Sequence, residues 1–412
     1  MESPFDNIVN CCGCGACASA CTHKAISLIA NAQGFVYPVI DKDKCIDCGL
    51  CRKVCGYGKT ELLHREKQTC YGGIDCSIEK SQSSSGGIAN VISQWIIKNG
   101  GVVYGCALEN SEELLVPRHI RVQEEKDLRK LQGSKYVQSD IGETYIQAKK
   151  DLKNGLLVLF TGTPCQIAGL YSYLRHSYDN LFTIDVICHG VPSKQLFQDS
   201  VKKFEKENRG KVKSLLFRDK SNFPALNQKI IYNQKIIYNQ KIIYNQKIIY
   251  NQKINVRYYT DSTYYTCFLR GDIYRDCCYS CPYAKQQRVG DISLGDFWGI
   301  EKTNPEEIRQ NGGPIDPKQG VSCVLVNSDQ GELLLEKVKN NLYLFNSDIE
   351  SISLNNHQLN HPSNKPSCRG HILQQYEKHG YDRFLYAVHN AYKWPDRIAK
   401  TKRFIKRLLC IK

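Results

Sequence analysis

The first 55 residues contain eight cysteines, arranged as two copies of the spacing C-x2-C-x2-C-x3-C. In bacterial ferredoxins, three close thiolates of each copy hold one 4Fe–4S cluster, and the fourth ligates the other cluster. The first predicted ligand set is therefore Cys11, Cys14, Cys17 and Cys55, and the second is Cys45, Cys48, Cys51 and Cys21. Two zinc sites are the alternative, but zinc ligands usually come as separated C-x2-C pairs, so two clusters are favoured.

A second group of cysteines is dispersed along the chain. Cys278 and Cys281 form a C-x2-C pair, for which metal binding is the favoured interpretation. Cys165 and Cys188 each follow an apolar strand, and parallel strands would bring both to the same edge of a sheet. The four thiols could then hold a third 4Fe–4S cluster, although spacing alone favours buried, inert thiols for Cys165 and Cys188. We expect no ligand role for the surplus Cys12, and a structural role for Cys70, Cys76, Cys106, Cys267, Cys323, Cys368 and Cys410.

Two short turns have the composition of phosphate-binding loops. Residues 83–87, Ser-Ser-Ser-Gly-Gly, lead directly into an apolar helical pattern, where backbone N–H groups and the helix dipole favour an anion. Residues 133–136, Gly-Ser-Lys-Tyr, add a cation and an aromatic ring. Neither turn matches the P-loop or the dinucleotide fingerprint, and a flexible serine linker is the alternative for the first. The run from Gly290 to Gly299 predicts a strand and a turn carrying an acid that faces a site, or else an ordinary capped turn.

The elements that must position these residues follow an alternating pattern after a charged connector at 61–67. Helices are expected over 88–98, 141–154 and from Gln166, and strands over 102–108, 156–160 and 181–188. Apolar strands that alternate with helices indicate βαβ units. We therefore expect a ferredoxin-like α+β module followed by an α/β domain with a mainly parallel sheet.

Residues 227–250 contain four copies of Asn-Gln-Lys-Ile-Ile-Tyr, and a partial copy follows at 251–254. A period of six keeps every copy on the same faces of a β-strand, whereas in a helix the apolar face would rotate from copy to copy. The repeat therefore predicts a β-rich insertion that forms a hairpin arm. It carries no residue suited to redox chemistry.

Composition limits the class of protein. The chain has 412 residues, 21 cysteines and a formal net charge of +15. Residues 1–10 lack a signal-peptide pattern and no apolar run is long enough to cross a bilayer, so reduced thiols in the cytoplasm are expected. Part of the basic excess offsets the anionic clusters, and no recognition motif supports binding to nucleic acid. The basic tail at 400–412 is compatible with peripheral membrane contact, but a helix packed on its own domain is favoured.

Taken together and in order, these motifs resemble a known family. The ferredoxin module followed by SSSGG, GSKYVQS, TGTPCQ, CHGVPS, FRDK, CYSCPYA and GDISLGDFWG is similar to the beta subunits of coenzyme F-420 hydrogenase and dehydrogenase, from about Asn10 to Asn327. The resemblance implies an FAD beside a cluster, with a deazaflavin hydride carrier docking on the flavin. It strengthens the third-cluster assignment. It also implies that the flavin is contacted by Ser85, Gly86, Gly87, Ser134, Lys135, Tyr136 and Thr163. The repeat and the basic C-terminal region depart from the family pattern.

The resulting expectation is an oxidoreductase subunit that moves electrons between a hydride carrier, FAD and 4Fe–4S clusters, together with a redox partner protein. The carrier can be a deazaflavin or another molecule, and no acid–base residue is nominated. One alternative is a flavin-free, ferredoxin-like electron carrier that docks a partner enzyme. Another is a reductive enzyme of sugar or polysaccharide metabolism. The expected domains are residues 1–60, the ferredoxin-like module; 68–160 and 161–330, the two parts of the flavin domain; and 331–412, a helical basic region.

Overall fold

The computed structural model describes residues 7–59, 65, 67–77, 83–111, 114–220, 226–238 and 247–392. The first of these ranges forms a small ferredoxin-like module. It contains the short helices α1 (Ala16–Ala20) and α2 (Leu50–Lys53), and the antiparallel strands β1 (Ile26–Ala30) and β2 (Val36–Ile40). Gly15 and Gly49 precede α1 and α2 with φ of 77° and 68°, a left-handed conformation that glycine adopts without steric strain.

The body of the protein is built on one eight-stranded sheet with the order β13-β3-β12-β11-β7-β6-β4-β5. Its strands are β3 (Thr69–Asp75), β4 (Val102–Ser111), β5 (Leu114–Val122), β6 (Val158–Gly162), β7 (Leu181–Val186), β11 (Ile292–Asp296), β12 (Ser322–Val326) and β13 (Leu342–Ser347). Only the central pairs β11–β7, β7–β6 and β6–β4 are parallel, and the outer pairs are antiparallel. The sheet is therefore mixed, and the expectation of a mainly parallel sheet was wrong.

Helices cover both faces of this sheet. On one face lie α4 (Ile88–Lys98) and α10 (Asp329–Val338), and on the other lie α5 (Thr144–Lys153) and α6 (Pro164–Leu174). Successive residues of a strand alternate between these cores: Leu159 faces α4, whereas Phe160 faces α6. The helices and strands expected between residues 88 and 188 are confirmed, with ends shifted by a few residues.

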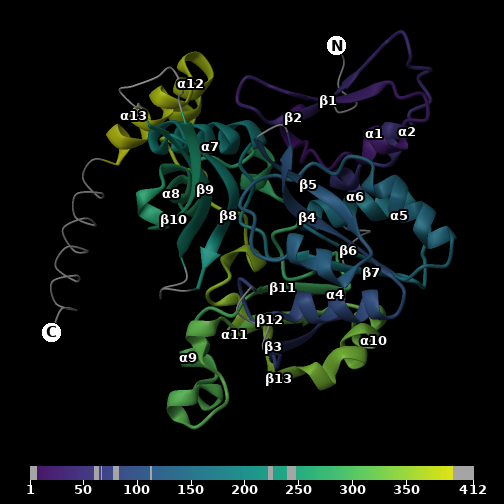
Figure 1. Ribbon diagram of the computed structural model, residues 1–412. Helices are drawn as coiled ribbons and strands as arrows, with labels where there is room; N and C mark the ends of the chain where they lie inside the picture. Colours follow the sequence, from purple (N-terminus) through teal and green to yellow (C-terminus); the bar gives the residue numbers. More distant parts are fainter. Residues whose placement is uncertain are drawn as a thin grey trace.

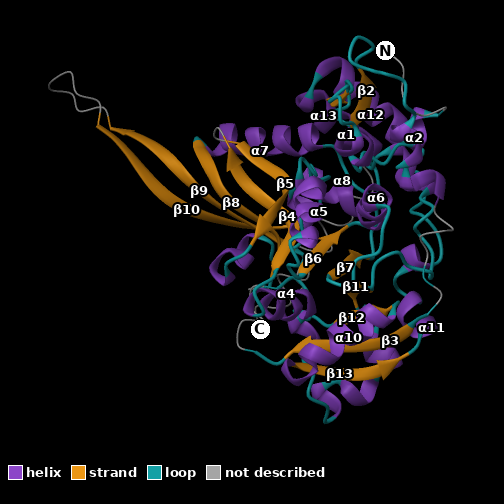
Figure 2. Ribbon diagram, turned by 90° about the vertical axis from the view of Figure 1, so that its right-hand side faces the viewer, coloured by secondary structure: helices purple, strands orange, loops and turns teal. Residues whose placement is uncertain are grey.

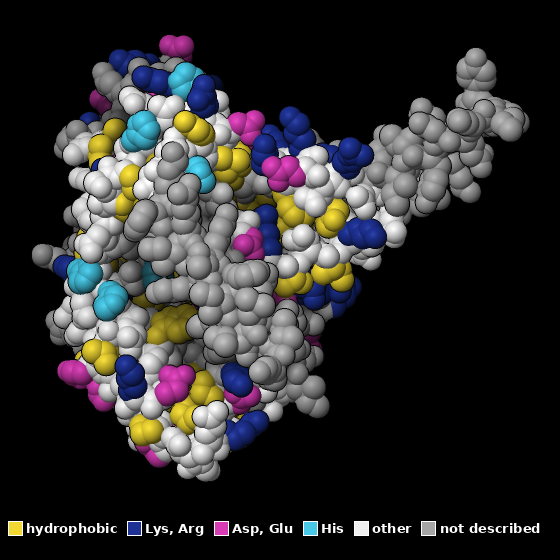
Figure 3. Space-filling view, turned by 90° about the vertical axis from the view of Figure 1, so that its left-hand side faces the viewer, with side chains coloured by type: hydrophobic (Ala, Val, Ile, Leu, Met, Phe, Trp, Pro, Cys, Tyr) yellow, Lys and Arg dark blue, Asp and Glu magenta, His cyan; other side chains and the backbone are white. Residues whose placement is uncertain are grey.

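A second, smaller sheet carries the hexapeptide repeat. Strand β8 (Gly210–Asp219) pairs with β9 (Asn227–Tyr238), which pairs antiparallel with β10 (Lys247–Tyr258). The repeat thus forms the expected hairpin, and Figure 2 shows β9 and β10 extending away from the body. At its base, Ile230 and Tyr232 are buried in a core with α7 (Lys194–Asn208) and α8 (Thr263–Arg270). Figure 3 shows Lys and Arg side chains, in dark blue, around the place where this arm leaves the body.

The C-terminal region contains both a strand of the large sheet and several helices. Strand β13 is an edge of the large sheet, and the helices α12 (Arg369–His379) and α13 (Tyr381–Ala391) pack together beside α7 (Figure 1). The short helix α11 (Ile349–Ser353) follows β13, and the short helix α9 (Ile300–Thr303) lies earlier in the chain, between β11 and β12. The region from 331, expected to be helical, contains the strand β13 as well as helices, and the basic tail at 400–412 lies outside the described residues. No helix in the described part of the chain is long and apolar enough to cross a bilayer.

Candidate functional site

A cavity of about 410 Å³, called the edge cavity below, opens at one edge of the large sheet. The pairing pattern makes β3, β11, β7, β6 and β4 run in the same direction, so their carboxyl ends meet at this edge. Crevices at the carboxyl ends of such strands are common ligand sites in α/β proteins. The segments that follow β3, β6, β7 and β11 all contribute residues to its wall.

The serine- and glycine-rich turn at 83–87 forms one side of the edge cavity. Ser84, Ser85 and Gly87 line it, together with the first residues of α4. Gly87 is the N-cap of α4 with φ of 90°, and a Cβ there would lie 2.8 Å from Asp75 Cβ. A side chain at this position would therefore be strained and crowded. The helix start faces the cavity, as an anion site requires.

The prediction for Gly86 differs from its position in the structure. Gly86 does not line the edge cavity, and a Cβ there would lie 2.4 Å from the carbonyl oxygen of Gly73. Its N–H donates to Ser322 Oγ at 3.0 Å. Gly86 is thus needed for close packing of the turn on β3 and β12, behind the cavity wall.

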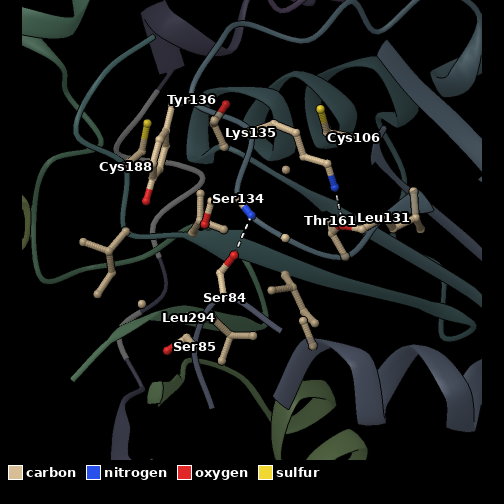
Figure 4. Close-up of a pocket in the computed structure, with 18 of the residues that line it drawn as sticks. Ser84, Ser85, Cys106, Leu131, Ser134, Lys135, Tyr136, Thr161, Cys188 and Leu294 are labelled. Atoms are coloured by element: carbon tan, nitrogen blue, oxygen red, sulfur yellow. Dashed lines mark hydrogen bonds between the residues drawn. The ribbon is translucent and has the colours of Figure 1, made fainter. Parts of the chain in front are cut away.

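The second turn, at 133–136, is tied to the first. The N–H of Ser134 donates to Ser84 Oγ at 2.8 Å, and Figure 4 shows this bond between the two turns. Lys135 also lines the cavity, and its Nζ donates to the carbonyl oxygens of Leu131 and Gln132, each at 2.7 Å. Burial lowers the pKa of Lys135 to about 8. The turn therefore offers a cation whose charge depends on pH near neutrality.

Tyr136 lines the edge cavity, but it is packed on one side by an aromatic ring. The ring of Phe268 stacks on it, with centroids 4.3 Å apart and planes 16° apart. Burial raises the pKa of Tyr136, so its hydroxyl stays protonated at neutral pH. The rings of Phe217 and Tyr265 also lie close, with centroids 5.3 and 5.5 Å away, so Tyr136 is part of an aromatic cluster in the cavity wall.

Thr163 lines the cavity and begins α6. Its side chain and that of Gln166 form a capping box, which fixes the first turn of the helix. Thr163 Oγ1 also lies 3.2 Å from Cys165 Sγ. The threonine thus orients Cys165 at the boundary between the edge cavity and the neighbouring cysteine site.

That neighbouring site is a smaller cavity, called the thiol cavity below. The cysteines that line it are Cys12, Cys165, Cys188, Cys277, Cys278 and Cys281. The four predicted ligands of a third cluster therefore come together, since Cys165 lies in the first turn of α6, Cys188 follows β7 and the pair comes from the turn at 276–281. Six thiols form a soft donor set that suits iron–sulfur chemistry. In the described residues, no group of three or more His, Cys, Asp or Glu side chains has the arrangement of a single-ion site.

Burial strongly affects these thiols. It raises the pKa of Cys281 to about 12 and raises that of Cys188 further. Buried next to this site, Arg288 forms an ion pair with Asp185 at 2.7 Å and donates to the carbonyl oxygen of Tyr283 at 3.0 Å. The ion pair holds β7 against the loop that follows Cys281. Binding of a metal would displace the thiol protons, as in other cysteine metal sites.

A third cavity lies within the ferredoxin-like module. Its cysteines are Cys11, Cys12, Cys14, Cys17 and Cys55. They include the whole predicted first ligand set, with Cys55 joining from the second cysteine run. Burial raises the pKa of Cys11 to about 11 and that of Cys17 to about 12.

The predicted second ligand set is less buried. Cys45 and Cys48 act electrostatically on the thiol of Cys51, whose pKa is raised mainly by burial. Cys21 accepts a hydrogen bond from the N–H of Ala25 at 3.3 Å. Its assignment to this set remains a prediction from the spacing.

Several residues of the site were missed by the sequence reasoning. Cys12 lines all three cavities, although it was assigned no role. Cys277 lines the thiol cavity, and its position directly before Cys278 was the available signal. The buried guanidinium of Arg275 and the amides of Asn90 and Gln132 carried no recognisable motif.

The acid expected in the run 290–299 is Asp296. It ends β11, lines the edge cavity and forms an ion pair with Arg218, which comes from the F-R-D-K motif on β8. The guanidinium of Arg218 lies 5.4 Å from the centroid of the Trp298 ring. The acid therefore faces a site, as one of the two interpretations of this run predicted.

Comparisons with known proteins agree with this geometry. Residues 156–352 match the family model for the C terminus of the beta subunit of coenzyme F-420 hydrogenase/dehydrogenase, and residues 10–59 match a 4Fe-4S dicluster domain. Residues 156–352 therefore form a C-terminal domain of the coenzyme F-420 hydrogenase/dehydrogenase beta-subunit family. The second match shows that the ferredoxin-like module is a domain for two 4Fe–4S clusters, as the cysteine spacing predicted.

Two individual proteins are also similar to parts of this chain. An iron-sulfur subunit of CoB–CoM heterodisulfide reductase from Methanocaldococcus jannaschii is 47% identical over an alignment of 84 positions, which covers 16% of this chain and 13% of that protein. A chain in the structure of the F-420-reducing nickel–iron hydrogenase complex from Methanosarcina barkeri superposes with a TM-score of 0.43 and 15% identity. That superposition covers 72% of this chain and 89% of the other.

Proposed function

We propose that this protein is an iron–sulfur flavoprotein subunit of an oxidoreductase, which moves electrons between a hydride carrier, FAD and 4Fe–4S clusters. One observation carries the proposal: the edge cavity and the thiol cavity share a wall. Cys12, Thr163, Cys165 and Cys188 line both. A cofactor in the edge cavity would therefore lie in contact with the thiols that would hold a cluster.

The residues of the edge cavity fit a flavin nucleotide. Its volume of about 410 Å³ is in the range of cofactor sites, and it combines apolar walls with a few polar groups. The start of α4 and the Lys135 ammonium can hold a pyrophosphate, and the Ser84 hydroxyl, which accepts from the N–H of Ser134, can donate a hydrogen bond to it. When bound, a flavin supplies the exchange between two-electron hydride chemistry and single-electron transfer.

For the third cluster we propose the ligands Cys165, Cys188, Cys278 and Cys281. The observation that supports them is their convergence on one cavity from three separate segments. Cys12 and Cys277 line the same cavity, and we assign them no ligand role. The protein's part is to keep the four sulfurs fixed and away from bulk water.

The sites follow one another along the molecule. The edge cavity adjoins the thiol cavity, and Cys12 links both to the cavity that holds Cys11, Cys14, Cys17 and Cys55. Cys45, Cys48 and Cys51, on the exposed side of the module, would carry the last cluster. Electrons would then pass between the hydride carrier at the edge cavity and a partner protein at the ferredoxin-like module.

The test is the cofactor content of protein purified without oxygen. Bound FAD with about twelve irons per chain is expected, that is, three clusters of four irons. Cys165→Ala and Cys278→Ala should each reduce the content to about eight irons, whereas the exposed Cys76→Ala should retain twelve. About eight irons in the wild type and no flavin after adding FAD would contradict the proposal and indicate a flavin-free electron carrier.

A further inference from the structure

Two side-chain amides in the wall of the edge cavity form a hydrogen bond with each other. This bond leaves one amide donor and one amide acceptor without a partner in the pair. Gln132 Nε2 donates to Asn90 Oδ1 at 2.7 Å, and both residues line the cavity. Among the residues that the structure describes, Asn90 Nδ2 and Gln132 Oε1 are buried and have no hydrogen-bond partner. Exchanging N and O in both amides would preserve this pattern, because the pair always leaves one donor and one acceptor.

Buried polar groups without a partner are unusual in proteins. Asn90 is only 7% exposed, so its free donor lies largely away from the surface and inside the wall of the edge cavity. A donor next to an acceptor is complementary to a ring edge that offers one acceptor and one donor. Adenine has such an edge at N7 and N6, whereas guanine offers two acceptors, N7 and O6.

The place of the amide pair in the fold selects which part of a ligand it meets. Asn90 lies on α4, three residues after Gly87, and Gln132 precedes the turn at 133–136. Both lie next to the two turns that can hold a pyrophosphate. Asn90 lines the edge cavity but not the thiol cavity, and α4 packs on the opposite face of the sheet from the helix α6 that begins near Cys165.

In FAD the pyrophosphate lies between the flavin ring and the adenosine. If the ring is placed at the cysteine wall and the pyrophosphate at the start of α4, the adenosine extends towards Asn90 and Gln132. We propose that this amide pair forms a binding site for the base of an adenine nucleotide, and that it selects FAD over FMN. The inference rests on the proposed function for the identity of the nucleotide.

The test compares ligands as well as variants. It uses protein that keeps its clusters but from which the flavin has been removed. Asn90→Leu and Gln132→Leu should each weaken FAD binding roughly tenfold, and the double variant should be little weaker than either, since the pair acts as a unit. FMN binding should be unchanged. Gln94→Leu, on the same helix but outside the cavity wall, is the matched control.

ADP and GDP test the base site without a flavin. Calorimetry should show that wild type binds ADP more tightly than GDP, and that Asn90→Leu removes this preference. If FMN binding weakens as much as FAD binding, the pair contacts the flavin half and the inference is overturned. Unchanged FAD and ADP binding in both variants would overturn it as well. Binding of ADP with selective loss in Asn90→Leu, but no binding of any flavin, would contradict only the proposed function.

Discussion

The guanidinium of Arg275 donates a hydrogen bond from Nε to the carbonyl oxygen of Cys11 at 2.5 Å. Its Nη2 donates to the carbonyl oxygen of Val36 at 2.6 Å, and its Nη1 to Gln138 Oε1 at 3.2 Å. Arg275 is completely buried, and it directly precedes the turn that carries Cys277 and Cys278. One cation therefore joins the ferredoxin-like module to the thiol cavity and lies between two proposed cluster sites.

Arg275→Met should make the cluster at Cys11 harder to reduce, because a reduced cluster carries one more negative charge. A unit charge several ångströms away at intermediate dielectric is worth about 2 kcal/mol, or roughly 90 mV for one electron. Arg275→Lys keeps the charge and should shift the midpoint potential less. A redox titration followed by EPR measures this shift, with iron content confirming that the clusters are retained. An unchanged potential at full iron content would show that Arg275 acts only through packing.

Lys135 should make the binding of a phosphate-bearing ligand depend on pH. Burial lowers its pKa to about 8, so the ammonium loses its proton as pH rises through that value. The affinity for FAD should therefore fall by about tenfold between pH 7 and 9. Flavin fluorescence titrations measure it. Lys135→Met should bind weakly with no such pH dependence, and equal pH profiles for the two proteins would contradict a role for this charge.

His119 should make the folded protein less stable in mild acid. Its Nε2 lies 2.9 Å from the carbonyl oxygen of Thr161 and its Nδ1 2.9 Å from Ser139 Oγ. A carbonyl only accepts, so Nε2 carries the proton and Nδ1 accepts from the serine. Burial lowers the pKa of His119 from 6.5 to about 4, and the neutral ring is the form that fits.

As pH falls, the unfolded chain takes up this proton at a higher pH than the folded protein does. The stabilisation of the folded protein by the neutral His119 ring is therefore complete above pH 6.5 and is lost as pH falls towards 4. Between pH 7.5 and 5.5 the loss should be about 1.4 kcal/mol. Thermal unfolding of wild type and of His119→Gln at these two pH values measures it, since the variant lacks the proton uptake. The exposed His176→Gln is the control. If both variants lose the same stability as wild type, the acid sensitivity comes from other groups.

The sequence predicted those parts of the site that depend on local spacing. The cysteine runs and the turns at 83–87 and 133–136 are contiguous, so their chemistry can be recognised without the fold. Cys165 and Cys188 required one further step, the rule that parallel strands end at the same edge. That step succeeded because β6 and β7 do lie side by side and parallel.

The parts that were missed depend on contacts between distant segments. Nothing in the sequence around Cys12 indicates that this residue lines three cavities. Likewise, nothing in the sequence around Arg275 indicates that its guanidinium binds Cys11 and Val36. The mixed sheet arises because β12 and β13 pair antiparallel with β3, which is about 250 residues earlier in the chain. Gly86 was predicted to contact the flavin because it belongs to the Ser-Ser-Ser-Gly-Gly motif that resembles the family, but the backbone of β3 lies directly behind it.

The part of the hairpin arm beyond its base should be dispensable for cofactor binding. Removal of residues 233–238 together with 247–252 keeps the pairing of Tyr232 with Lys253 and of every pair below it. It costs two pairings with β8, those of Gly210 and Lys211. Iron and flavin contents should therefore equal those of wild type, with only a small fall in the unfolding temperature.

Tyr232→Ala at the base is the contrasting variant. Tyr232 is buried, and its ring meets that of Phe204 edge to face, with centroids 5.3 Å apart. Truncating a buried aromatic side chain leaves a cavity and costs about 3 kcal/mol, which thermal unfolding would detect. If the shortened arm instead loses flavin or iron, residues beyond the base must reach the site or hold the core around it. Normal cofactor content with a weaker reaction towards a partner protein would place the arm in docking.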